Sequence, residues 1–198
     1  MKDNDILTAI LEENLGYLKT ADAVAAGVSK TSLSVYVRKK ELERVAHGLY
    51  LAKDAWRDSL FEIQVRYPKA IFSHETALFF LRMTDREPLC HSLTLAKTMG
   101  VSRLREEGIK TYRIREELFE IGLSTVSSSF GHTLRCYNAE RTICDILRYR
   151  KTIDTQDLQV SLKTYFRSRS KDLNSLLKYA KLFSIEELVR QYLEVLLP

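Results

Sequence analysis

Between Gly27 and Lys40 the sequence carries four basic residues and no acidic one, together with several short hydroxyl side chains. Short polar side chains near the start of a helix can reach the edges of bases, and a guanidinium can bind a phosphate or a guanine. The pattern is therefore typical of a surface that contacts double-stranded DNA, although the solvated face of an ordinary helical hairpin has the same composition. At helical spacing, the outward face presents Lys30, Thr31, Ser34, Val35 and Arg38.

Two short helices joined by a tight turn are the elements that must position this face. Apolar residues at helical spacing predict a first helix over 3–13. Thr20 is a plausible N-cap for a second helix over 21–26, and Ser29 for a third over 30–40. Gly27 lies between them and supplies the left-handed backbone of a turn. This layout predicts a helix-turn-helix.

The packing requirements of a helix-turn-helix are also met by the sequence. A small side chain, Ala23, lies four residues before Gly27 and fits the point where the two helices cross. We expect Val24 and Val28 to pack inward, with Leu33, Tyr36 and Val37 on the inner face of the third helix. The alternating stretch that begins at Leu42 and runs through the closing Gly48-Leu49-Tyr50 predicts a two-stranded wing. The resulting candidates for contact with DNA are Lys30, Thr31, Ser32, Ser34, Arg38, Lys39, Arg44 and His47.

The pattern changes after Trp56. Helical and alternating segments then follow one another, and from Asn138 onward the chain is mostly helical. Helices are expected to start at Asn138, at Asp154 or Thr155, and at Asp172. Ser184 with Glu187 is expected to form a capping box for the last helix. We therefore predict an α+β protein with a winged helix-turn-helix domain over residues 1–57 and a larger mixed domain with a helical end over residues 58–198.

Composition sets wide limits on the class of protein. The net charge is +5 with a pI near 9.0, which favours nucleic-acid binding only weakly, because residues 1–58 hold nine basic and nine acidic residues. No apolar run reaches the length needed to cross a bilayer, so we expect no membrane contact. The acids in the N-terminal segment argue against a signal peptide. Three cysteines without close spacing predict a cytoplasmic protein with buried thiols.

The segment from Gly16 to Leu51 resembles the N-terminal winged helix of the AbiEi family, the antitoxins of type IV toxin–antitoxin and abortive-infection systems. The similarity includes the turn Gly27-Val28-Ser29 and the closing motif His47 to Tyr50. The later stretches SHETALFFL, YNAERTICDILRYR and YAKLF also look like this family, of which ERTICD is the most specific. In one departure, the family often has Gly where Lys40-Glu41 leads into the wing, so we expect a different bend in the approach to the wing here.

This resemblance implies a transcriptional repressor that is also an antitoxin in phage defence, and that is not an enzyme. It implies binding to inverted repeats of operator DNA upstream of its own operon, by a protein that is monomeric in solution and binds DNA in multiple copies. It further implies that the C-terminal domain neutralises a cognate nucleotidyltransferase-like toxin without forming a stable complex. No cofactor or metal ion is expected.

The helix that contains ERTICD carries charged residues at spacings of three and four. We predict that its apolar residues face the core and that its charges form a solvent-facing antitoxin surface; intrahelical ion pairs on a solvated face would give the same pattern. A basic stretch runs from Arg141 to Lys181. Within it, Tyr165 to Lys171 mixes aromatic and basic residues, which fits either a frayed helix end or a second phosphate-contacting patch. The candidate antitoxin surface consists of Glu140, Arg141, Asp145 and Arg148.

Two other functions remain open at this point. A nucleic-acid-processing enzyme could use Glu140 or Asp145, although no acid-x-Lys pair and no nucleotide-binding motif occurs. A winged-helix repressor could instead sense a small molecule through its C-terminal domain. The histidines and cysteines lack the close ligand pairs that zinc sites usually show.

Overall fold

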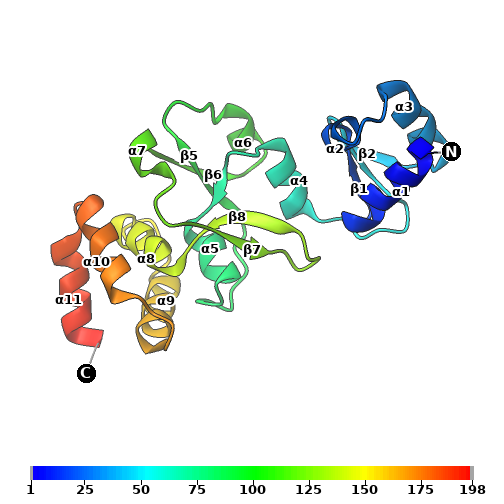
Figure 1. The fold of residues 1–198 in the computed structure, drawn as a ribbon. Coiled ribbons are helices and arrows are strands. Elements are labelled where there is room, and N and C mark those ends of the chain that lie inside the picture. The colour runs from blue at the N-terminus through cyan, green and yellow to red at the C-terminus, as the bar shows by residue number, and fades with distance from the viewer. Residues whose placement is uncertain (1, 197–198) are drawn as a thin grey trace. The chain divides into compact units, whose positions relative to one another are not determined.

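The computed structural model describes residues 2–196, which form two compact units (Figure 1). The first unit runs to Pro68 and includes residues 127–134; the second comprises 69–126 and the chain from 135 onward. Helices and sheets are both present, so the predicted α+β class is confirmed. The predicted domain boundary between residues 57 and 58 stays a prediction, and the compact body of the first unit extends past it. Among the described residues, no helix has the length and apolar character needed to cross a membrane.

The first unit has the elements of a winged helix. Its three-stranded antiparallel sheet has the order β1-β3-β2, and the helices α1 to α3 share one apolar core with it. The strand β1 was not predicted, because three residues are too short to show alternation. The elements are α1 (Lys2–Glu13), β1 (Tyr17–Lys19), α2 (Thr20–Ala25), α3 (Lys30–Lys39), β2 (Glu43–Ala46), β3 (Leu49–Leu51) and α4 (Ser59–Arg66).

The second unit is built on a five-stranded mixed sheet of order β6-β5-β4-β8-β7. Strand β4 pairs antiparallel with β5 and parallel with β8, while β5 and β6 are parallel. Its elements begin with β4 (Ile71–Phe72), α5 (His74–Phe80), β5 (Ser92–Ala96), α6 (Ser102–Glu106), β6 (Lys110–Ile114) and α7 (Glu116–Phe119). They continue with β7 (Leu123–Ser127), β8 (Thr133–Tyr137), α8 (Ala139–Arg148), α9 (Thr155–Arg167), α10 (Leu173–Leu182) and α11 (Glu186–Leu196).

Helix α8 lies at the centre of the second unit. It contacts α5, α9, α10 and α11 (Figure 1). Its apolar residues belong to a core of buried side chains in the second unit. All residues from Glu140 to Leu147 are buried. A helix with neighbours on this many sides has no solvated face over most of its length.

Several predicted helix caps are confirmed, and two are wrong. The side chain of Asn138 accepts a hydrogen bond from the Arg141 amide at 2.9 Å, and Asp154 and Asp172 cap α9 and α10. Thr20 is instead the first residue of α2, preceded by Lys19 without a side-chain cap. Ser184 has a left-handed backbone with φ of +57° and α11 begins only at Glu186, so the predicted capping box is not formed.

Candidate nucleic-acid interface

The turn between α2 and α3 has the predicted geometry. Gly27 has φ of +85°, and the chain then enters α3 through Ser29, whose Oγ accepts a hydrogen bond from the Ser32 amide at 3.0 Å. A left-handed residue followed directly by an N-cap reverses the chain within a few residues. The sequence therefore correctly predicts both the turn and the start of α3.

Packing fixes which face of α3 is turned outward. Ala23, Leu33 and Tyr36 are buried in the core of the winged helix, with Val37 packed against it. The Tyr36 hydroxyl also forms a 2.9 Å hydrogen bond with Thr8 Oγ1, which ties α3 to α1. These contacts leave the opposite face to solvent.

One part of the predicted packing is wrong. Val28 is buried as expected, but Val24 is 46% exposed. The short α2 turns its Ala23 side inward, and this leaves the adjacent residue at the surface.

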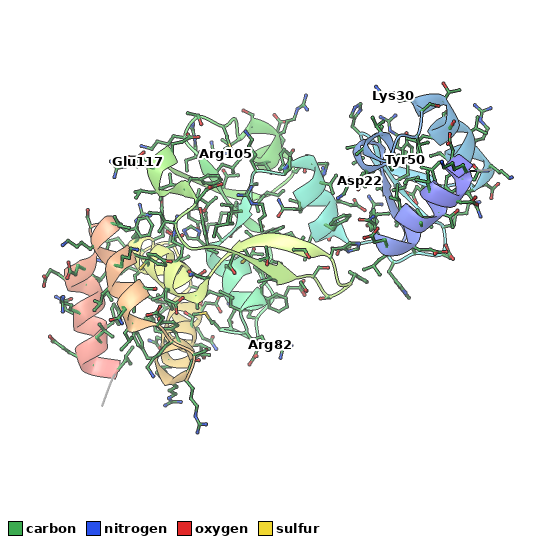
Figure 2. The ribbon with its side chains drawn as sticks, in the orientation of Figure 1. Asp22, Lys30, Tyr50, Arg82, Arg105 and Glu117 are labelled. Carbon is green, nitrogen blue, oxygen red and sulfur yellow. The ribbon has the colours of Figure 1, made fainter. Side chains whose placement is uncertain are left out.

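The exposed face of α3 is basic and has no carboxylate. Every predicted contact residue of this helix is exposed except Ser32, which is half-buried beside the Ser29 cap. Val35 on the same face is 61% exposed. Figure 2 labels Lys30 at the start of α3. The exposed residues on this face are Lys30, Thr31, Ser34, Val35, Arg38 and Lys39.

The wing adds two further exposed side chains. Strands β2 and β3 are antiparallel with a register shift between Arg44 and Ala46. The Arg44 guanidinium donates to Nδ1 of His47 across 3.2 Å and to the Ala46 carbonyl across 3.4 Å. These bonds hold the two side chains together on the wing, and no carboxylate among the described residues neutralises the guanidinium.

The approach to the wing is bent at Glu41. This residue has φ of +53°, a backbone region that favours glycine, at the position where the resemblance noted Gly in related chains. The Glu41 carboxylate pairs with Lys53 at 2.6 Å, and this hydrogen bond lowers the pKa of Glu41. The backbone therefore adopts a left-handed turn at this position without a glycine.

A buried polar network joins β1, the start of α4 and residues 128–132, and was not predicted. The Asp58 carboxylate accepts from Ser128 Oγ at 2.5 Å and from His132 Nδ1 at 2.7 Å, and also caps α4. The Tyr17 hydroxyl accepts from the Asp58 amide at 2.7 Å and donates to Glu62 at 3.2 Å. Residues from three distant stretches of sequence meet here, so no local pattern could have indicated the network.

The predicted antitoxin surface on α8 is wrong in its placement. Glu140 is 8% exposed, Arg141 0% and Asp145 1%, and only Arg148 is partly exposed. Glu140 accepts hydrogen bonds from the Tyr165 hydroxyl and the Asp172 amide, both at 3.1 Å. Tyr165 of α9 and the start of α10 cover Glu140, whereas Arg141 is covered by other segments of the second unit. Sequence spacing along one helix carries no information about such a cover.

Arg141 is held by the interior of the second unit. Its guanidinium donates to Asp145 at 2.8 Å and to the carbonyls of Leu118 and Ile121 at 2.9 and 2.7 Å. The ring centroids of Tyr137 and Phe183 lie 4.0 and 4.3 Å from the guanidinium carbon of Arg141. Burial raises the pKa of Asp145, and the Arg141 charge opposes this. The ERTICD motif thus joins α8 to the end of α7 and to α10.

Basic side chains elsewhere in the second unit do reach the surface. Most of the predicted basic stretch is exposed, on α9, α10 and the segments beside them. The exposed members are Arg150, Lys151, Lys163, Arg167, Arg169, Lys178 and Lys181.

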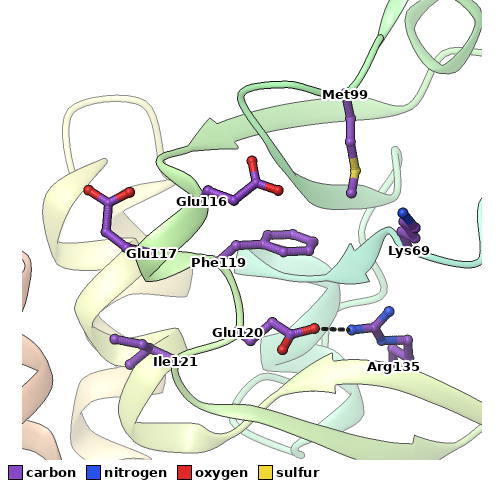
Figure 3. A pocket seen from close by; sticks show the side chains of 8 residues that line it. All are labelled: Lys69, Met99, Glu116, Glu117, Phe119, Glu120, Ile121 and Arg135. Atoms are coloured by element: carbon purple, nitrogen blue, oxygen red, sulfur yellow. Dashed lines mark hydrogen bonds and ion pairs between the residues drawn. The ribbon is translucent and has the colours of Figure 1, made fainter.

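A pocket of about 690 Å³ is also present in the second unit (Figure 3). Glu116, Glu117 and Glu120 line it together with Lys69 and Arg135, and Arg135 pairs with Glu120 at 3.3 Å. Because acidic and basic side chains both line the pocket, its charges do not favour either an anionic or a cationic ligand.

The remaining reactive residue types give no further site. Among residues 2–196, no three His, Cys, Asp or Glu side chains are grouped to hold a metal ion. Burial raises the pKa of the Cys136 and Cys144 thiols to about 12. Cys90 is exposed, so the expectation of buried thiols is wrong for this residue.

Comparisons with known proteins agree with the winged helix. The chain shares its fold with the crystal structure of the RV2827C protein from Mycobacterium tuberculosis, with a TM-score of 0.59 and 13% identity over 89% of this chain and 70% of that one. A search of curated protein sequences finds no match. Residues 5–53 match the model of a family described as a transcriptional regulator, AbiEi antitoxin. This match confirms the resemblance to the AbiEi antitoxin family over the segment that carries the Gly27–Ser29 turn and the His47–Tyr50 closing motif.

Proposed function

We propose that the protein is an antitoxin that represses its own operon by binding operator DNA through α3 and the wing. The observation that carries this proposal is the exposed, acid-free face of α3 beside Arg44 and His47, within the segment that matches the regulator family. An α-helix fits the major groove, where Arg38 can pair with a guanine and Val35 can contact a thymine methyl group. Lys30, Lys39 and Arg44 suit phosphates, which fix register without reading sequence.

The operator is an inverted repeat occupied by more than one copy of a protein that is monomeric in solution. Footprinting of the DNA upstream of the gene tests this arrangement. Two protected half-sites about one helical turn apart, or a multiple of it, are expected on one face of the duplex. A single protected site with no symmetry would contradict it.

Neutralisation of a nucleotidyltransferase-like toxin is assigned to the second unit. Glu140, Arg141 and Asp145 of α8 are buried and Arg148 is only partly exposed, so the acting surface is better sought among the exposed basic side chains of α9 and α10. Lys163 and Arg167 are both exposed and lie four residues apart on α9. Reversing both charges is therefore expected to weaken protection.

Growth rescue tests this division of labour when the toxin is expressed from an unrelated promoter, because repression cannot act there. The full chain with Arg38→Ala is expected to protect cells, and the full chain with Lys163→Glu and Arg167→Glu is expected to protect poorly while still binding operator DNA. If the Arg38→Ala protein folds normally by circular dichroism but fails to protect, then neutralisation depends on DNA binding and the two activities are not independent.

The alternative of a nucleic-acid-processing enzyme loses its proposed residues. Glu140 and Asp145 are buried and already bonded to protein groups, so neither can reach a substrate.

A further inference from the structure

A large groove in the first unit lies next to the candidate DNA-binding face. Its volume is about 1090 Å³, and its walls come from α2, the start of α3, the wing and α4. This volume is slightly above the range of about 300–1,000 Å³ that is usual for small-molecule sites. Three of the candidate DNA-contacting residues, Lys30, Arg44 and His47, line it.

The charges around this groove are all of one kind. Lys19, Lys30 and Arg44 carry positive charge, and no Asp or Glu lines the groove. Lys19 is partly engaged, since its ammonium lies 3.8 Å from Asp22 and 5.0 Å from the Phe61 ring centroid. Lys30 and Arg44 have no carboxylate partner among residues 2–196 and are exposed. Because opposite charge and accessible donors favour an anion, the groove is complementary to a negatively charged ligand.

The rest of the lining is apolar or uncharged. Val24 is a surface-exposed valine on α2, and Tyr50 and Val65 contribute a half-buried ring and a half-buried aliphatic side chain. Figure 2 labels Tyr50 in the winged helix, where it belongs to β3. A site with apolar walls and a few convergent polar groups suits a ligand that has both a flat apolar part and a charged part.

We propose that this groove binds a nucleoside monophosphate. Its phosphate carries close to two negative charges at neutral pH and accepts hydrogen bonds from Lys30 and Arg44. Its base packs against Val24 and Tyr50, which offer apolar contact without reading the identity of the base. The Thr20 and Thr133 hydroxyls, which also line the groove, suit the ribose.

The consequence for repression rests on the proposed function. Because Lys30 and Arg44 cannot contact a nucleotide and a DNA phosphate at the same time, ligand and operator compete. By linkage, each then lowers the affinity of the protein for the other by the same factor. The protein would in this way release its operator when free nucleotide is abundant.

Isothermal titration calorimetry on the full chain tests binding without any DNA. Because the walls do not read the base, we expect AMP, GMP, CMP and UMP all to bind, and adenosine and inorganic phosphate to bind at least tenfold more weakly than AMP does. No heat from any of the four monophosphates at millimolar concentration overturns the proposal. Equal binding of AMP and inorganic phosphate also overturns it, because the apolar walls would then contribute nothing.

Variants at Val24 locate the site. Val24→Glu puts a carboxylate into the groove, whereas Val24→Gln adds a side chain of the same size without charge. Both changes are at an exposed position, so both proteins are expected to fold, as circular dichroism can verify. The glutamate variant should bind nucleotide at least tenfold more weakly than the glutamine variant, and equal affinities would place the ligand elsewhere.

Competition is measured by operator binding with and without nucleotide. At a ligand concentration nine times its dissociation constant, the apparent dissociation constant for DNA should rise about tenfold. An unchanged value for a protein that binds both ligands would overturn the competition. Arg38 does not line the groove, so Arg38→Ala should lose operator affinity and keep nucleotide affinity. A wild-type protein that binds nucleotide and no DNA would contradict the proposed function and leave the ligand site standing.

Discussion

Arg141 and Asp145 form an ion pair of 2.8 Å in which neither side chain reaches solvent beyond 2% of its surface. A buried pair of this kind is costly to break, because the remaining charge is left in a medium of low polarity. The pair therefore explains the ERTICD motif as a requirement of folding.

Replacement of Asp145 by Asn is expected to lower the free energy of unfolding by about 3–5 kcal/mol, because Arg141 then keeps an uncompensated buried charge. Arg148 also pairs with the Asp145 carboxylate, at 3.3 Å, but its side chain is 26% exposed. Arg148→Ala should therefore lower the free energy of unfolding by only about 0–1 kcal/mol. Urea unfolding followed by circular dichroism measures both. Similar losses of unfolding free energy in the two variants would mean that the buried Arg141–Asp145 pair stabilises the protein no more than the partly exposed Arg148–Asp145 pair.

His74 should make the second unit sensitive to acid. Burial lowers the pKa of His74 well below 6.5, and Arg141, Lys110 and Arg148 act in the same direction. Below pH 6.5 the unfolded chain binds a proton that the folded chain does not, so the free energy of unfolding falls as the pH falls. The limiting slope for one such group is about 1.4 kcal/mol per pH unit.

The variant His74→Asn isolates this effect, because Asn tolerates the left-handed backbone that His74 adopts at φ of +49°. Urea midpoints at several values between pH 5 and 6.5 should depend less steeply on pH in the variant. Parallel curves for the two proteins would rule out His74 as the source.

Tyr17 is expected to lower stability at alkaline pH. Burial raises its pKa to about 12, and Glu62 contributes in the same direction. Between pH 10 and 12 the unfolded chain loses the phenolic proton while the folded chain keeps it, so stability falls with rising pH. In Tyr17→Phe, unfolding should be easier at pH 7, since the Asp58 amide loses its acceptor, but should depend less on pH in this window.

Unfolding curves at pH 10, 11 and 12 for the two proteins provide the comparison. Other buried tyrosines titrate in both chains and cancel in the difference. A slope that is unchanged by the substitution would show that Tyr17 does not titrate differently in the folded and unfolded states.

Gly27→Val should destabilise the first unit by at least about 1–2 kcal/mol, the cost of a left-handed residue. No heavy atom of the described residues lies within 4 Å of a Cβ built at this position, so the cost comes from the backbone and not from a clash. Gly27→Asn is the control, because Asn adopts this backbone more easily. Thermal melts that place both variants at the wild-type temperature would show that the turn is not under this constraint.

The sequence predicts local features of the fold well. Gly27, Ser29 and Asn138 act within a few residues of themselves, and all three have the predicted role. It fails where the outcome depends on distant segments. The charged residues of α8 are covered by segments far from that helix in the sequence, among them the end of α7 and α9. The network of Asp58 and His132 joins residues 74 positions apart. Neither could be read from the spacing within one helix.

Operator affinity measured by fluorescence anisotropy at several salt concentrations tests the central claim, which is that α3 reads DNA. Arg38→Ala should weaken the binding free energy for operator DNA by about 1–3 kcal/mol and that for a scrambled duplex much less. Lys30→Ala should instead weaken binding to both duplexes and reduce the salt dependence of binding by about one unit of slope. Lys53→Ala is the control, because it removes one positive charge from an exposed residue that pairs with Glu41. It should change neither the affinity for the two duplexes nor the salt dependence. Operator affinity that is unchanged in Arg38→Ala and Lys30→Ala, or lowered equally in Lys53→Ala, would contradict the claim.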